Sequence, residues 1–123
     1  MKFLCLAYYD PGKFAALSPE ALQTLVSQCP AHDATLRASG ALRLQASLGD
    51  PAATRTLRPG SEKPSVTDGP FVETKEQVGG FFIIDATDMN EALRIAAKHP
   101  AALLGEDVGW AVEVRPVEFF ESY

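Results

Sequence analysis

The sequence predicts an α+β domain in which two helices cover one face of a four-stranded antiparallel sheet. The first observation behind this prediction is the order of its apolar patterns, β-α-β-hairpin-β-α-β, which is that of the ferredoxin-like split βαβ motif. The second is that two of the four main strands are apolar on both faces, whereas the other two alternate. Doubly apolar strands belong at the centre of a sheet. The ferredoxin-like order 4-1-3-2 places them there.

The two central strands are expected at residues 2–9 and 78–86, where apolar side chains fall on both faces. The two edge strands are expected at residues 41–48 and 110–117, where apolar and polar residues alternate. On the first edge strand, period-two counting assigns Leu42, Leu44, Ala46 and Leu48 to the helix-packing face and Arg43, Gln45 and Ser47 to the other.

Both helices carry recognisable start signals. Ser18-Pro19 begins the first, because Ser caps a helix and Pro fits its first position, and Gly40 ends it. Pro30 lies inside this pattern and is expected to break or kink the helix nearby. The second helix begins with a capping box formed by Asp88 and Glu91 and stops before Pro100.

The remaining segments are expected to be turns and loops. Asp10-Pro11-Gly12 is a turn signal, residues 101–109 form a loop of small residues, and residues 73–77 form a charged connector. Residues 52–70 contain a β-hairpin that leaves the main sheet. Because 123 residues suit one domain, we expect residues 1–123 to fold as a single unit.

Composition excludes several classes of function. The 16 acidic and 11 basic residues leave a net charge of −5, which argues against a nucleic-acid partner. No apolar run approaches the roughly 18 residues of a membrane helix. The N-terminal apolar run is too short for a signal peptide, so we expect a soluble cytoplasmic protein. Two cysteines make no disulfide framework, and Cys5 and Cys29 are expected to be buried, inert thiols.

The sheet face turned away from the helices is expected to be too apolar for a monomer. It would carry Leu4, Leu6 and Tyr8, together with two apolar side chains of the third main strand. An exposed patch of this kind marks an interface. We therefore expect a homodimer in which two sheets pack face to face.

A ligand pocket is expected between the two sheets of that dimer. Two arginines suit a carboxylate or phosphate, and a few polar groups in an apolar cleft orient a small ligand. The alternative is a rim of solvated or paired charges that discourages edge aggregation. The candidate ligand-binding residues are Tyr8, Arg43, Gln45, Glu113 and Arg115.

Acid–base chemistry has two candidates, His32 and Asp68. Asp68 precedes Gly69-Pro70 and either forms an Asx-type turn or serves as a general base. His32 is either an exposed helical histidine or an acid–base group. His99 is expected to cap a helix C-terminus, where the dipole favours a cation. We expect no metal and no cofactor, because the metal-ligand spacings and the nucleotide-binding motifs are absent.

Three segments, residues 1–6, 66–85 and 112–117, resemble the YCII-related family and, more narrowly, its DGPF-domain branch. The block that runs from Thr67-Asp68-Gly69-Pro70-Phe71 to Gly79-Gly80 is the most specific. The resemblance implies a dimeric α+β barrel built from ferredoxin-like protomers, similar to muconolactone isomerases. It also implies an inferred His–Asp active site and a link to extracytoplasmic-function sigma factors.

Only part of the family's active-site pattern matches residues of this sequence. Cys29-Pro30-Ala31-His32 is similar to the family's Arg-Pro-Ala-His segment, so His32 matches its histidine. The family's Asp-Pro is replaced by His99-Pro100, which leaves Asp68 as the substitute carboxylate if its loop folds over the pocket. Two functions follow as hypotheses. One is a small enzyme or binding protein for an anionic metabolite, and the other is a non-catalytic regulatory module acting with a sigma factor.

Overall fold

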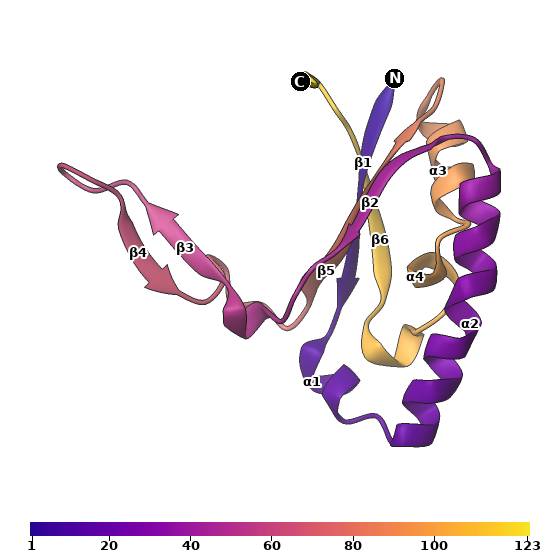
Figure 1. Cartoon of the computed structure of the whole chain (residues 1–123), viewed down its shortest axis with the longest axis horizontal. Helices are drawn as coiled ribbons and strands as arrows, with labels where there is room; N and C mark the ends of the chain where they lie inside the picture. Colours follow the sequence, from indigo (N-terminus) through magenta and orange to yellow (C-terminus); the bar gives the residue numbers. More distant parts are fainter.

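The computed structural model describes all 123 residues and has two antiparallel sheets and four helices (Figure 1). The predicted α+β class, with a four-stranded antiparallel sheet, is confirmed. Two short 3-10 turns cover residues 51–53 and 106–108. The elements are β1 (Lys2–Tyr9), α1 (Pro11–Ala15), α2 (Pro19–Ala38), β2 (Leu42–Ser47), β3 (Arg55–Arg58), β4 (Ser65–Asp68), β5 (Gln77–Asp85), α3 (Met89–Ala96), α4 (Pro100–Leu103) and β6 (Ala111–Pro116).

The main sheet has the order β2-β5-β1-β6, so the two doubly apolar strands occupy its centre. In the register of β1 and β5, Phe3 lies opposite Ile84 and Cys5 lies opposite Phe82. All four side chains are almost fully buried under the helices. The helices α2, α3 and α4 all lie on this one side of the sheet (Figure 1). The core is therefore a single layer between sheet and helices, completed by Leu36, Ala86, Ala92 and Ala96.

Helix α2 runs without a break through Pro30, contrary to the expected break. Proline lacks an N–H, so the carbonyl of Val26 loses its usual helical donor. Both Pro30 and Val26 are exposed, and water can satisfy that carbonyl. The helix begins as predicted, with the Ser18 side chain accepting from the Ala21 N–H.

Strand β2 contains a bulge that the alternating pattern does not reveal. Leu42 lies opposite Ile84, but Leu44 lies opposite Ile83, so Arg43 is the extra residue. Because side chains alternate with a period of two, this one-residue shift moves every later side chain to the opposite face. The prediction that Gln45 lies on the face away from the helices is therefore wrong, since Gln45 faces the helix layer.

Two expected loops contain helical turns. Asp10 caps α1, because its carboxylate accepts from the Lys13 N–H at 3.1 Å, so this segment is a helix start rather than a simple turn. The segment 101–109 is not an open loop either, since it contains most of α4 and a 3-10 turn. His99 stands at the N-terminus of α4 and not, as predicted, in a capping role at a helix C-terminus.

The sheet face away from the helices is not covered by any other part of the chain. We call it the open face; its half-buried apolar side chains at the centre are Leu4, Leu6, Phe81 and Ile83. We call residues 55–68, which hold β3, β4 and their connection, the arm. The arm confirms the predicted hairpin and extends away from the body on the open-face side (Figure 1). None of the helices is both long enough and apolar enough for a membrane span.

Candidate functional site

A cavity of about 620 Å³ lies on the helix side of the main sheet, where the ends of β1, β2 and β5 meet α2 and α4. This volume is within the range of small-molecule sites. Its wall combines apolar rings with a small number of polar side chains. The polar residues of the wall are Cys29, Asp33, Arg37, Gln45, Ser47 and His99, and the aromatic ones are Tyr8, Tyr9, Phe14, Phe81 and Trp110.

Helix α2 supplies one stripe of the wall. Cys29, Asp33 and Arg37 are spaced four residues apart, and this spacing places side chains on one helical face. Asp33 is half-buried, whereas Arg37 is exposed near the last turn of the helix. The stripe therefore brings a carboxylate and a guanidinium to the same cavity.

His99 supplies the opposite wall. Its Nδ1 accepts a hydrogen bond from the Ala101 N–H at 3.0 Å, so the proton of the neutral ring is on Nε2. The ring stacks on Phe82 with centroids 4.6 Å apart and planes 3° from parallel. Burial lowers the pKa of His99 from its ordinary 6.5, and the charge of Asp33 partly opposes this lowering. The site thus holds a neutral imidazole with Nε2–H available to a ligand.

The glycine pair Gly79-Gly80 inside β5 forms the floor of the cavity. A Cβ on Gly79 would lie 2.8 Å from the ring of Tyr9, and one on Gly80 would lie 2.9 Å from the carbonyl oxygen of Ala46. Both positions therefore need glycine for close packing. Tyr9 in turn packs edge-on against Phe14, with ring centroids 5.9 Å apart.

The two thiols have the character that the sequence predicts for inert cysteines. Burial raises the pKa of Cys5 to about 12. Cys29 is half-buried in the cavity wall, and burial together with the charge of Asp33 raises its pKa. Neither sulfur is a ready thiolate, because nucleophilic cysteines need a lowered pKa.

The predicted acid–base pair, His32 and Asp68, is not brought together within the chain. His32 is half-buried on α2 but is not part of the cavity wall. Asp68 lies on the arm with 89% of its side chain exposed, and it forms an ion pair with Arg55 at 3.5 Å. The cavity instead contains His99, at the position where the resembled family has an aspartate, and Asp33, next to His32.

Four of the five predicted ligand-binding residues lie on the open face. Tyr8 donates a hydrogen bond to Glu113 at 2.9 Å, and this bond raises the pKa of Tyr8. Leu4 lies opposite Arg115 on β6, so Arg115 shares that face. Arg43 is also on that side, and Tyr8 reaches the cavity as well. Gln45 is the exception, since the bulge turns it into the cavity wall.

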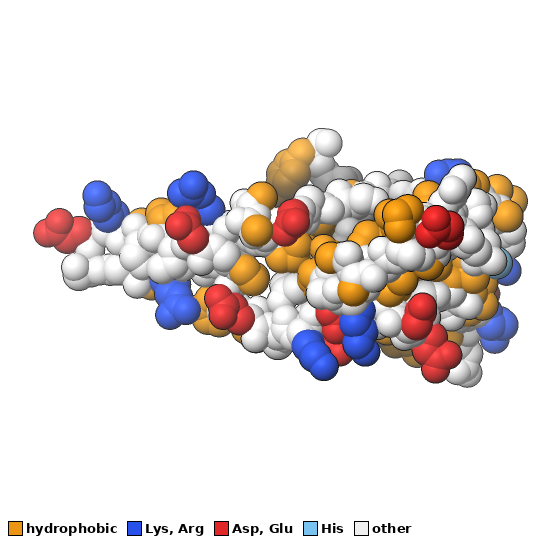
Figure 2. Space-filling view, turned by 90° about the horizontal axis from the view of Figure 1, so that it is seen from below, with side chains coloured by type: hydrophobic (Ala, Val, Ile, Leu, Met, Phe, Trp, Pro, Cys, Tyr) orange, Lys and Arg blue, Asp and Glu red, His pale blue; other side chains and the backbone are white.

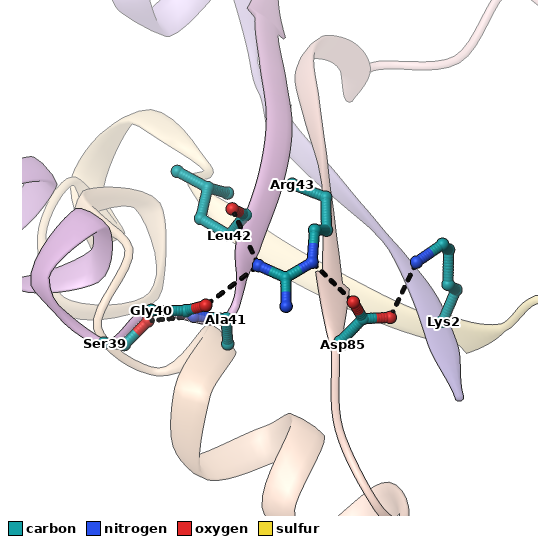
Figure 3. A network of polar contacts seen from close by, with 7 residues as sticks. All are labelled: Lys2, Ser39, Gly40, Ala41, Leu42, Arg43 and Asp85. Atoms are coloured by element: carbon teal, nitrogen blue, oxygen red, sulfur yellow. Dashed lines mark hydrogen bonds and ion pairs between the residues drawn. The ribbon is translucent and has the colours of Figure 1, made fainter. Parts of the chain in front are cut away.

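Arg43 is already engaged in a polar network (Figure 3). Its guanidinium binds the carboxylate of Asp85 and donates to the Gly40 carbonyl at 2.8 Å. Lys2 binds the other oxygen of Asp85 at 2.8 Å. These two hydrogen bonds hold the pKa of Asp85 below its ordinary value. These paired charges fit the alternative of a rim of paired charges better than a free anion site at Arg43.

Sequence reasoning did not find Asp33, Arg37 and the cavity role of His99. The spacing of Cys29, Asp33 and Arg37 was the available signal, but it reads equally as a solvated helical stripe. No three His, Cys, Asp or Glu side chains gather in a way that would hold a metal ion. The site therefore offers one neutral imidazole, one carboxylate and one guanidinium around an aromatic cavity.

The chain belongs to the YCII-related domain family, whose sequence profile matches residues 1–119. It is 33% identical over 121 residues to an uncharacterised protein of Rhizobium meliloti (strain 1021), covering 98% of this chain and 95% of that protein. Among solved structures it is similar to a 5-chloro-2-hydroxyhydroquinone dehydrochlorinase from Burkholderia phenoliruptrix AC1100, in complex with 2,5-dihydroxybenzoquinone. There the TM-score is 0.45 and the identity 19%, over 92% of this chain and 91% of that one.

Proposed function

We propose that the cavity binds a small anionic molecule, that the Nε2–H of His99 donates a hydrogen bond to it and that Asp33 accepts a proton from it. The observation that carries the proposal is a neutral imidazole, stacked on Phe82, in the same 620 Å³ cavity as Asp33 and Arg37. Arg37 would hold the anionic group, because a guanidinium pairs with carboxylates and phosphates. Because burial lowers the pKa of His99, its ring is neutral near neutral pH, and its Nε2–H can donate a hydrogen bond to negative charge on the bound molecule.

Asp33 is the proton acceptor in this proposal. Its half-buried carboxylate lines the same cavity as His99, so it can take a proton from a bound molecule. The roles expected of His32 and Asp68 thereby pass to His99, as a hydrogen-bond donor, and to Asp33, as the base. The reaction would be a proton shift or a hydrolysis within an aromatic cavity.

A thermal-shift screen with benzoate, phosphate and short dicarboxylates tests the binding step. A specific ligand raises the Tm in proportion to the logarithm of its concentration once the site is saturated. We expect Arg37→Gln to abolish the rise and Arg115→Gln to preserve it. The opposite result would place the anion site on the open face, and a rise that survives both substitutions would exclude both arginines.

We also propose that two ferredoxin-like protomers form a dimeric α+β barrel by packing their open faces together. The support is the row of apolar side chains at the centre of the open face, Leu4, Leu6, Phe81 and Ile83, with charged residues at the edge strands. An apolar centre with a polar rim is typical of protein interfaces. In such a dimer the Tyr8–Glu113 pair and Arg115 would lie at the rim.

A further inference from the structure

The arm has an apolar face that nothing in its own chain covers. Leu57 lies opposite Val66 in the register of β3 and β4, so the two side chains share one face. They are 69% and 57% exposed. Thr56 and Thr67 form the neighbouring pair on the other face. An antiparallel ribbon that alternates in this way packs its apolar face on another surface, and an isolated two-stranded hairpin is marginally stable in water.

Hydrogen bonds join the two ends of the arm at its root. The Gly69 N–H donates to the Thr54 carbonyl at 2.7 Å, and the Thr56 hydroxyl donates to the Gly69 carbonyl at 2.8 Å. Gly69 has a φ of +86°, which a residue with a side chain adopts only with strain. The root of the arm therefore needs glycine at position 69, and its hydrogen bonds close the hairpin where it leaves the sheet.

The arm leaves the body on the same side of the molecule as the open face (Figure 1). Figure 2 shows hydrophobic patches between the charged side chains along the arm. The arm and the open face thus present two uncovered apolar surfaces to one neighbour. A second copy of this chain is the occupant that would cover both, because a two-fold axis repeats the same pair of surfaces on each partner.

The size of the open face also favours a second contact. The two edge strands have six residues each, and the two central strands have eight and nine. At about 4.8 Å between strands and about 3.3 Å per residue, the open face has a projected area of roughly 450 Å². A standard stable interface takes about 800 Å² of accessible surface from each partner. The arm is the other apolar surface on that side, and its contact would enlarge the area that a dimer buries.

We propose that the arm of each copy clasps the second copy and packs its Leu57–Val66 face on the partner while the open faces pack together. This inference rests on the proposed homodimer and adds a contact to it. The arm is then an assembly element, and the hydrogen bonds at Gly69 close the hairpin at its root.

The test is a dilution series of the full chain by sedimentation velocity, with the double variant Leu57→Ser/Val66→Ser. The matched control is Val26→Ser/Leu93→Ser, two apolar residues of the helix layer that are 54% and 49% exposed. We expect the arm variant to raise the dimer dissociation constant by about tenfold or more, because two aliphatic side chains lose their burial. We expect the control to stay within about twofold of the wild type.

The outcomes separate the two proposals. A wild-type dimer that the arm substitutions leave unchanged overturns the clasp, retains the homodimer and leaves the arm to a different protein. A wild-type monomer at micromolar concentration overturns both. Amide hydrogen exchange of the wild type, above and below its dissociation constant, gives a readout that needs no variant. We expect slower exchange of residues 55–68 in the dimer, and equal exchange contradicts the clasp.

Discussion

Gly80 is a residue at which a single added carbon atom should be costly. Its Cβ would lie 2.9 Å from the Ala46 carbonyl oxygen, a backbone atom of the neighbouring strand that cannot turn aside. We expect Gly80→Ala to lower the free energy of unfolding by about 1–3 kcal/mol, the usual cost of overpacking. Urea denaturation measures this difference.

Gly49→Ala is the matched control, because no atom lies within 4 Å of the position that its Cβ would take. We expect this variant to be as stable as the wild type or slightly more stable, since alanine reduces the freedom of the unfolded chain. Equal losses in the two variants would show that the close contact of β2 and β5 at Gly80 has no energetic role.

His99 should make the protein less stable in acid. Its pKa is lowered by burial in the folded protein and is about 6.5 when the chain unfolds, so the unfolded state binds the proton first as the pH falls. The contribution of neutral His99 to the free energy of unfolding is therefore complete above about pH 6.5. It is lost as the pH falls through the pKa that His99 has in the folded protein. Between the two pKa values the loss approaches about 1.4 kcal/mol per pH unit.

His99→Asn tests this titration, because asparagine retains an acceptor for the Ala101 N–H but does not titrate. We expect the variant to lose most of the decline in unfolding free energy between pH 7 and pH 5, measured by urea denaturation at each pH. His32→Gln is the control and should retain the decline. If His32→Gln removes the decline and His99→Asn retains it, His99 is not the histidine that causes the loss of stability in acid.

At the scale of the element, α2 contains an interior proline that the helix tolerates and does not need. Pro30→Ala restores an N–H that can reach the exposed carbonyl of Val26. Proline costs about 3 kcal/mol in a helix interior, and its rigidity in the unfolded chain returns about 1 kcal/mol. We therefore expect a net gain in unfolding free energy of about 1–2 kcal/mol.

Pro19→Ala is the comparison for this prediction. Pro19 is the first residue of the same helix, where its missing N–H has no helical acceptor, so its removal should give no gain. Thermal unfolding followed by circular dichroism distinguishes the two variants. A gain at Pro19, or a loss at Pro30, would contradict the account of α2 as a continuous helix that is locally strained.

The elements differ in how far their sequence patterns predict them. Runs that are apolar on both faces correctly indicate the central positions of β1 and β5. The alternation of β2 is misleading, since the bulge at Arg43 reverses the faces of the residues that follow it. Arg43 itself contacts Asp85 and the Gly40 carbonyl, which lie outside the strand. The apolar–polar pattern of one strand cannot predict a contact with a residue of another segment.

At the scale of the whole molecule, the site depends on segments that are far apart in the sequence. Asp33 and His99 meet in one cavity only because α2 and α4 pack on the same face of the sheet. The sequence alone favours His32 and Asp68 instead, because His32 stands in a recognisable motif and Asp68 in a tight turn. The residues of the cavity wall have no local motif, so the fold was needed to identify them.

The open face allows a direct test of the assembly itself. Leu6 lies near its centre, opposite Phe81 on one side and Glu113 on the other. In a monomer, Leu6→Lys places an ammonium in water beside Glu113, so the fold should tolerate it. In the proposed dimer the same charge is buried between two apolar sheets at a cost of about 3 kcal/mol or more. We expect light scattering to show a monomer for this variant at concentrations where the wild type is a dimer. Leu93→Lys, on the outer side of α3 and 49% exposed, should leave the mass unchanged. A dimeric Leu6→Lys protein with the wild-type dissociation constant would mean that the two copies meet through a different surface.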